Sequence, residues 1–180
     1  MAGYGPSLQK RQRPKSIKLK CMEENIMSYQ CEVKEQAAQV TLSIRTRTAV
    51  QNLPTVLGQG YGAIAQYLGG LGEQPAGPPF AIYYNMDTAD LDIELGFPVA
   101  RQFPGRAEIQ AGEIPGGRVA TCLYTGPYSH IAPAYEALSQ WMKDKGYEAT
   151  GVAYEFYLND PDQTPPAELQ TQIVFPLKSD

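Results

Sequence analysis

The second half of this sequence repeats the pattern of the first half, and the repeat restricts the possible folds more than any other feature. Phe97-Pro98 recurs as Phe175-Pro176, and Tyr83-Tyr-Asn85 recurs as Tyr157-Leu-Asn159. The two spacings differ by only a few residues, which loops accommodate at little cost. We therefore expect two β-α-β-β units, at about 29–99 and 107–178, related by a pseudo-two-fold axis.

Apolar periodicity predicts one helix and three strands in each unit. The helices are expected at about 53–70 and 129–145, the second with Ser129 as its N-cap. Five glycines in the first helix predict that it is the more mobile or irregular of the two. The expected fold class is α+β, a mainly antiparallel sheet with two main helices packed on it. The expected strands are 42–46, 80–85, 91–99, 120–125, 153–159 and 169–177.

Charge divides the 180-residue chain into a basic start and an acidic body. The first twenty residues carry six Lys or Arg and no acid, which leaves a net charge near −10 on the remainder. We expect residues 1–26 to be a disordered leader and 27–180 to be one domain; a leader that binds nucleic acid or a membrane is the alternative. An acidic body repels phosphate backbones, so we expect that 27–180 binds no nucleic acid.

The cysteine and histidine content argues against several kinds of site. Cys21, Cys31 and Cys122 form no CxxC pair, and His130 is the one histidine. A disulfide scaffold or a structural zinc site is therefore not expected, and we predict no metal, no cofactor and a reducing cytoplasm. No apolar run approaches the roughly 18 residues of a membrane span, so no membrane association is expected.

Glu155 is the candidate functional residue that the sequence singles out. It lies in an aromatic strand bounded by Gly151 and Asn159, and alternation places Ala153 and Tyr157 on its face. Neither face is plainly polar, so we expect the carboxylate to point toward a partly enclosed aromatic surface. An edge-strand glutamate in water, or one paired with an arginine such as Arg45 or Arg118, is the alternative reading.

Tyrosine is unusually abundant, with twelve tyrosines and one tryptophan against five phenylalanines. Aromatic side chains with polar tips suit a wet, adaptable pocket and offer π-faces to cations. Together with Glu155, the candidate ligand-binding residues are Tyr61, Tyr67, Tyr83, Tyr135, Trp141 and Tyr157.

Four motifs together resemble the GyrI-like small-molecule-binding domain: Gly77-Pro-Pro-Phe-Ala-Ile-Tyr-Tyr-Asn85, Tyr124-Thr-Gly-Pro-Tyr128, Leu138-Ser-Gln-Trp141 and Tyr154-Glu-Phe-Tyr-Leu-Asn-Asp-Pro161. The resemblance covers about 27–180. It implies a duplicated β-α-β-β module whose aromatic pocket, near the pseudo-symmetry axis, carries one acidic residue, and Glu155 matches that position. The same domain forms the effector-binding half of BmrR-like and some AraC/Rob-like regulators. Residues 1–26 are too short for a helix-turn-helix, so we expect a stand-alone member.

The resemblance implies three possible roles. The first is binding of bulky lipophilic cationic or aromatic compounds, by a protein that is a monomer or a weak dimer. The second is hydrolysis of strained, cyclopropane-containing electrophiles, with Glu155 as general base or as stabiliser of a developing positive charge, and a tyrosine such as Tyr157 donating a proton. The third is a gyrase-inhibitor-like role toward a protein partner. The residues themselves favour the first role, because an acid in an aromatic setting attracts cations.

Overall fold

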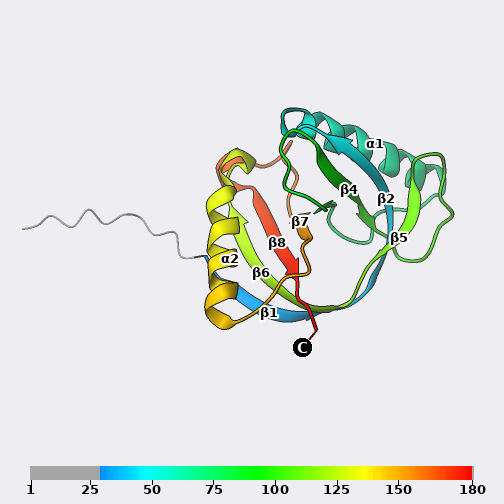
Figure 1. Ribbon diagram of the computed structural model, residues 1–180. Helices are drawn as coiled ribbons and strands as arrows, with labels where there is room; N and C mark the ends of the chain where they lie inside the picture. The colour runs from blue at the N-terminus through cyan, green and yellow to red at the C-terminus, as the bar shows by residue number, and fades with distance from the viewer. Residues whose placement is uncertain (1–28, 180) are drawn as a thin grey trace, which may run out of the picture.

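Eight strands form one antiparallel sheet in this computed structural model, which describes residues 29–179. The sheet is strongly curled, and two main helices pack on it (Figure 1). The strands are β1 (Cys31–Gln36), β2 (Gln39–Thr48), β3 (Phe80–Tyr83), β4 (Leu91–Pro98), β5 (Gln110–Ile114), β6 (Gly117–Thr125), β7 (Ala153–Tyr157) and β8 (Gln170–Pro176). The helices are α1 (Leu53–Gly70) and α2 (Ala132–Lys145), with short 3-10 turns at Val50–Asn52, Tyr128–His130 and Pro166–Glu168. The expected α+β class is confirmed.

The strand order is β1-β6-β8-β7-β3-β4-β2-β5. From either edge to the centre, the strands of each half follow one another in the same order. The series β6, β8, β7 on one side mirrors β2, β4, β3 on the other, and β7 meets β3 in the middle. The edge strands β1 and β5 are additions to the expected β-α-β-β units. Each precedes one half in sequence and pairs with the other, β1 with β6 and β5 with β2.

Backbone hydrogen bonds recur at matched positions of the two halves. The Tyr84 amide donates to the Asp92 carbonyl at 2.9 Å, and the Leu158 amide donates to the Gln170 carbonyl at 2.9 Å. The two halves are therefore similar in detail as well as in strand order. A common origin by duplication stays a prediction.

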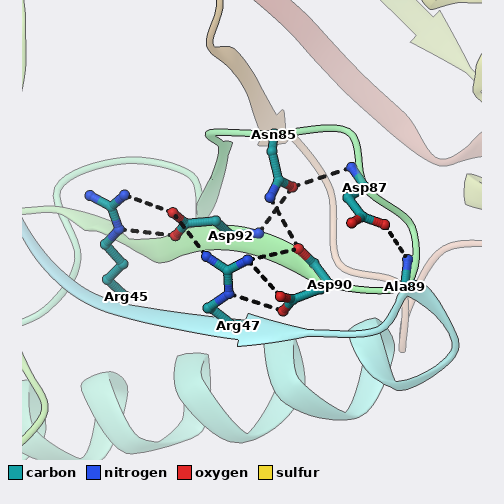
Figure 2. Close-up of polar contacts among 7 residues, drawn as sticks. All are labelled: Arg45, Arg47, Asn85, Asp87, Ala89, Asp90 and Asp92. Atoms are coloured by element: carbon teal, nitrogen blue, oxygen red, sulfur yellow. Dashed lines mark hydrogen bonds and ion pairs between the residues drawn. The ribbon is translucent and has the colours of Figure 1, made fainter.

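An asparagine after each central strand holds the following loop. Asn85 donates to the Asp90 carbonyl and accepts from the Asp92 amide (Figure 2). Asn159 bonds the loop before β8 in the same way, donating to the Glu168 carbonyl and accepting from the Gln170 amide. These asparagines fix the ends of β3 and β7, the strands at the centre of the sheet.

Arg45 and Arg47 brace the first of these loops from β2. Arg45 makes a bidentate contact with Asp92, at 3.0 and 2.9 Å, and Arg47 pairs with Asp90 (Figure 2). The strand register places Leu123 and Thr125 of β6 at the matched positions, and these side chains cannot form ion pairs. The loop of the second half is therefore held differently.

Helix α1 runs unbroken from Leu53 to Gly70 despite its glycines. A Cβ at Gly60 would collide with the Leu95 side chain, so this glycine allows α1 to approach β4 closely. Ser129 is not the N-cap of α2: it lies in a 3-10 turn, and α2 begins at Ala132 after Ile131. The expected end of α2 is confirmed, since Gly146 terminates it in the left-handed conformation with φ 76°.

The sheet buries apolar side chains on both faces. Residues such as Leu42, Ile93 and Leu95 pack with Ile64 and Leu68 of α1, while Phe80, Ile82, Tyr154, Phe156 and Val174 form a separate cluster. Alternation along β7 therefore places Glu155 and Tyr157 on the helix side of the sheet, as expected. Neither helix within 29–179 is long and apolar enough to cross a membrane. The predicted leader, 1–26, lies outside the described residues.

Candidate functional site

A large cleft of about 1650 Å³ opens on the helix side of the sheet. Both halves line it through matched positions: Tyr61 and Tyr135 from the helices, Tyr83 and Tyr157 from the central strands, and Phe97 and Phe175 from β4 and β8. The lining is mostly apolar, and a volume of this size accommodates a multi-ring organic molecule. The repeat therefore provides the walls of the cleft.

Glu155 is the exception to this matching. It lies directly opposite Ala81 in the β3–β7 pair, and Ala81 occupies the matched position of the first half. The Glu155 side chain lines the cleft although the residue is only 7% exposed. The centre of the cleft thus carries a carboxylate from one half only.

Three tyrosine hydroxyls donate to the Glu155 carboxylate. Tyr135 on α2 donates to Oε1 at 2.6 Å, and Tyr157 donates to Oε2 at 2.7 Å. Tyr83 reaches Oε2 at 3.4 Å and lies 3.3 Å from the Tyr157 hydroxyl. The two carboxylate oxygens are therefore satisfied by neutral donors, which is how a buried ion avoids the full cost of lost hydration.

Burial raises the pKa of Glu155, and the hydrogen bonds from Tyr135, Tyr157 and Tyr83 lower it in part. Burial and the neighbouring carboxylate also raise the pKa of each of these three tyrosines, so their hydroxyls stay protonated and act as donors. The expected arginine alternative is not observed, because Arg45 pairs with Asp92 and Arg118 lies over the Tyr147 ring.

Aromatic rings surround this carboxylate in edge-to-face contacts. Tyr61 packs against Phe97 at 5.4 Å between centroids, and Tyr135 packs against Phe175 at 5.8 Å in the same manner. Tyr128 contacts Tyr157 at 5.5 Å. Aromatic rings have electron-rich faces, so a cleft lined by them favours cationic and aromatic guests.

Five of the seven expected site residues line the cleft, namely Tyr61, Tyr83, Tyr135, Glu155 and Tyr157. Tyr67 and Trp141 do not. The Tyr67 hydroxyl donates to the Pro104 carbonyl, and Trp141 packs against Tyr147. Each follows its cleft-lining tyrosine by six residues, and with 3.6 residues per turn this spacing directs the side chain to another face of the helix.

Sequence reasoning missed several cleft residues. Phe97 and Phe175 carried a usable signal, since they recur in the repeat as the Phe-Pro pairs that end β4 and β8. Tyr128 ends the motif Tyr124-Thr-Gly-Pro-Tyr128, but it lies in a 3-10 turn before α2, where no periodicity predicts the direction of its side chain.

The charged residues that line the cleft are all acidic. Its lining includes Glu136, Glu155, Asp160 and Asp162, while none of the described residues that line it is Lys, Arg or His. Within residues 29–179, no group of three or more His, Cys, Asp or Glu side chains is arranged to hold a metal ion. The arrangement can therefore attract a cation, or use a desolvated carboxylate as a base.

The domain thus combines a curled antiparallel sheet with an open cleft that has the size and the mostly apolar lining of a small-molecule site. The chain belongs to the GyrI-like family, because the model of the GyrI-like small molecule binding domain matches residues 29–178. Comparison with functionally curated proteins gives no match.

Solved structures of the same fold include a DNA-bound protein. EcmrR in complex with DNA is 25% identical with a TM-score of 0.77, and the similar region covers 87% of this chain. The chain spans about 60% of the length of that EcmrR chain. The isolated EcmrR C-terminal domain is 24% identical, with a TM-score of 0.70 and coverage of 86% of this chain and 100% of that domain.

More distant structures share the fold alone. SAV2435 bound to tetraphenylphosphonium is 11% identical, with a TM-score of 0.61 and coverage of 84% and 94% of the two chains. A hydrolase from Listeria innocua is 14% identical, with a TM-score of 0.58 and coverage of 83% and 92%.

Proposed function

We propose that this domain binds bulky lipophilic cations in the cleft, with Glu155 as the anionic partner of the ligand. The observation that carries the proposal is the buried Glu155 carboxylate, which is held by three neutral tyrosine hydroxyls within an aromatic cleft. Because none of the described residues that line the cleft is cationic, the Glu155 charge is left for a ligand to neutralise, and in an environment of low polarity that attraction is stronger than in water.

The aromatic walls supply the second part of the interaction. Rings such as Tyr61, Phe97 and Phe175 provide apolar contact area, and a cation over a ring gains about 0.5–2 kcal/mol. The acids among the lining residues add an attractive field for a cation that approaches. The bound tetraphenylphosphonium in SAV2435 supports the choice of that compound as a probe.

Calorimetric titration of tetraphenylphosphonium against the wild type and Glu155→Gln tests the proposal. We expect Glu155→Gln to weaken binding at least about tenfold, or about 1.4 kcal/mol. The neutral compound triphenylphosphine oxide serves as a ligand control, and its affinity should change little with this substitution. Equal affinity of both proteins for the cation would contradict the proposal.

Glu94→Gln is the matched protein control. Glu94 lies on β4, beside the central strand β3, and accepts hydrogen bonds from Ser43 and Tyr84 at 2.6 and 2.7 Å, but it does not line the cleft. Its replacement removes one negative charge from a half-buried, hydrogen-bonded position elsewhere on the sheet. We expect cation affinity to stay within about twofold of the wild type, since exposed or distant charges are screened at physiological salt.

Hydrolysis of a strained electrophile is the second candidate function, and the short contact between Tyr157 and Glu155 favours it. A desolvated carboxylate is a stronger base than one in water, and the Tyr157 hydroxyl 2.7 Å away could donate to a developing oxyanion. Incubation with a cyclopropane-bearing electrophile, followed by mass spectrometry, separates the two functions. Turnover that Glu155→Gln abolishes would favour hydrolysis, whereas saturable binding without product favours the first proposal.

A further inference from the structure

Two free cysteines face each other across neighbouring strands, and Ile173 of β8 separates Cys122 from Glu155 in the same cross-strand row. Cys31 on β1 and Cys122 on β6 are register partners in an antiparallel pair. The Cys31 thiol donates to the Tyr29 carbonyl at 3.9 Å, and the Cys122 thiol donates to the Leu123 carbonyl at 3.8 Å. Cys122 is buried, whereas Cys31 is only half-buried at the start of the edge strand.

This arrangement fits the geometry that a disulfide requires. Directly opposed residues of antiparallel strands have Cα atoms about 4.5–5.5 Å apart, which lies within the range of about 4.4–6.8 Å found in disulfides. We propose that Cys31 and Cys122 are a covalent modification site, at which a low-molecular-weight disulfide such as oxidised glutathione forms a cross-strand disulfide. This inference is independent of the proposed function.

The chemistry proceeds by two exchange steps. The more accessible Cys31 attacks glutathione disulfide as its thiolate, forms a mixed disulfide and releases one glutathione thiolate. Cys122, as its thiolate, then attacks the Cys31 sulfur, forms the Cys31–Cys122 bond and releases the second glutathione. Two protein thiols are oxidised, one glutathione disulfide is reduced to two thiols, and the two protons pass to the released glutathione.

The surroundings determine the rate and the effect of the cross-link. Burial raises the pKa of both thiols, that of Cys122 to about 12, so the reaction should be faster at pH 9 than at pH 7. Cys31 and Cys122 pack in the same cluster as Leu138 and Met142 of α2. The bond would tie the edge strand β1 to the part of the sheet that supports α2, and it should raise the unfolding midpoint by more than about 5 °C.

The test uses the full chain with Cys21→Ser, because Cys21 and Cys31 share the tryptic peptide 21–34. After incubation with oxidised glutathione at about pH 8–9, free thiols are alkylated and the digest is analysed by mass spectrometry. We expect peptide 21–34 linked to peptide 119–143, which contains Cys122. Reduction should release both peptides and return the unfolding midpoint to its original value.

Two variants in the Cys21→Ser background complete the design. Cys122→Ser should stop at the mixed disulfide on Cys31, and Cys31→Ser should leave Cys122 largely unmodified because it is buried. Three outcomes would overturn the proposal: both thiols alkylated after oxidation, a mixed disulfide on Cys31 that persists while Cys122 is present, or a cross-link that leaves the unfolding midpoint unchanged.

Discussion

The two halves of the domain share a scaffold and differ at its centre. Each contributes a helix tyrosine, a central-strand tyrosine and a phenylalanine to the cleft. At the position where the second half has Glu155, the first half has Ala81, and these two residues are opposite each other. The comparison indicates that the matched scaffold forms the cavity, while one unmatched side chain gives it a charge.

Both halves of the domain contribute hydrogen-bond donors to the single carboxylate of Glu155. Tyr83 comes from the first half, whereas Tyr135 and Tyr157 come from the second, and all three donate to the same carboxylate. The corresponding helix tyrosine of the first half, Tyr61, donates instead to the Phe80 carbonyl at 2.8 Å. The cleft thus provides hydrogen-bond donors for one buried carboxylate.

The largest expected effect comes from giving the first half an acid as well. Ala81→Glu would place a second carboxylate directly opposite Glu155 in a fully buried position. We expect a loss of about 3–5 kcal/mol in the free energy of unfolding, because an uncompensated buried charge is costly. Chemical denaturation measures this loss.

The double variant Ala81→Glu/Glu155→Ala sharpens this test, since it moves the single acid to the other half. It should recover part of the stability lost in Ala81→Glu, because only one carboxylate then occupies the centre. Ala81→Glu with wild-type stability would show that the matched positions do not face each other.

The glycines of α1 give the next largest effect. Gly60→Ala forces a Cβ against Leu95 and should cost about 1–3 kcal/mol of stability. A Cβ at Gly62 would meet nothing within 4 Å, so Gly62→Ala should stabilise the protein by about 0.5–1 kcal/mol. Thermal unfolding of both variants separates the steric effect of a Cβ near Leu95 from the higher helix propensity of alanine. Equal effects of the two substitutions would refute the close approach at Gly60.

The matched helix tyrosines provide a smaller and more specific comparison. Tyr135→Phe removes a donor from Glu155, while Tyr61→Phe removes one from the Phe80 carbonyl, and each should cost about 1 kcal/mol of stability. Loss of the Tyr135 donor should also raise the pKa of Glu155 further. The midpoint of the pH dependence of cation binding should therefore move to higher pH in Tyr135→Phe only. A similar shift in Tyr61→Phe would mean that the two helices are equivalent at the site.

The ion pairs of the first loop should matter least. Arg45→Leu with Arg47→Thr installs the residue types that β6 carries at the matched positions. Exposed pairs contribute little and are screened by salt, so we expect a small fall in the unfolding midpoint that disappears at about 1 M salt. Tetraphenylphosphonium affinity should not change. A large loss of affinity would show that these ion pairs hold Met86 and Thr88, which line the cleft, in place.

Periodicity and the repeat predict the helices, the central strands and the face of Glu155, because each depends on local spacing. They do not predict β1 or β5, since Cys31–Gln36 and Gln110–Ile114 are short, polar edge segments without clear alternation. The sequence also does not predict which side chains form hydrogen bonds with Glu155. Which tyrosines reach the carboxylate depends on how α2 lies over the sheet, and the sequence contains no direct record of that packing.

The pH dependence of tetraphenylphosphonium affinity tests the central claim most directly. The pKa of Glu155 is raised in the folded protein, so protonation at falling pH removes the charge that the cation requires. We expect wild-type affinity to fall up to about tenfold per pH unit below that pKa, and the affinity of Glu155→Gln to stay low and flat. Parallel pH profiles for the two proteins would contradict the claim that Glu155 is the anionic partner of the ligand.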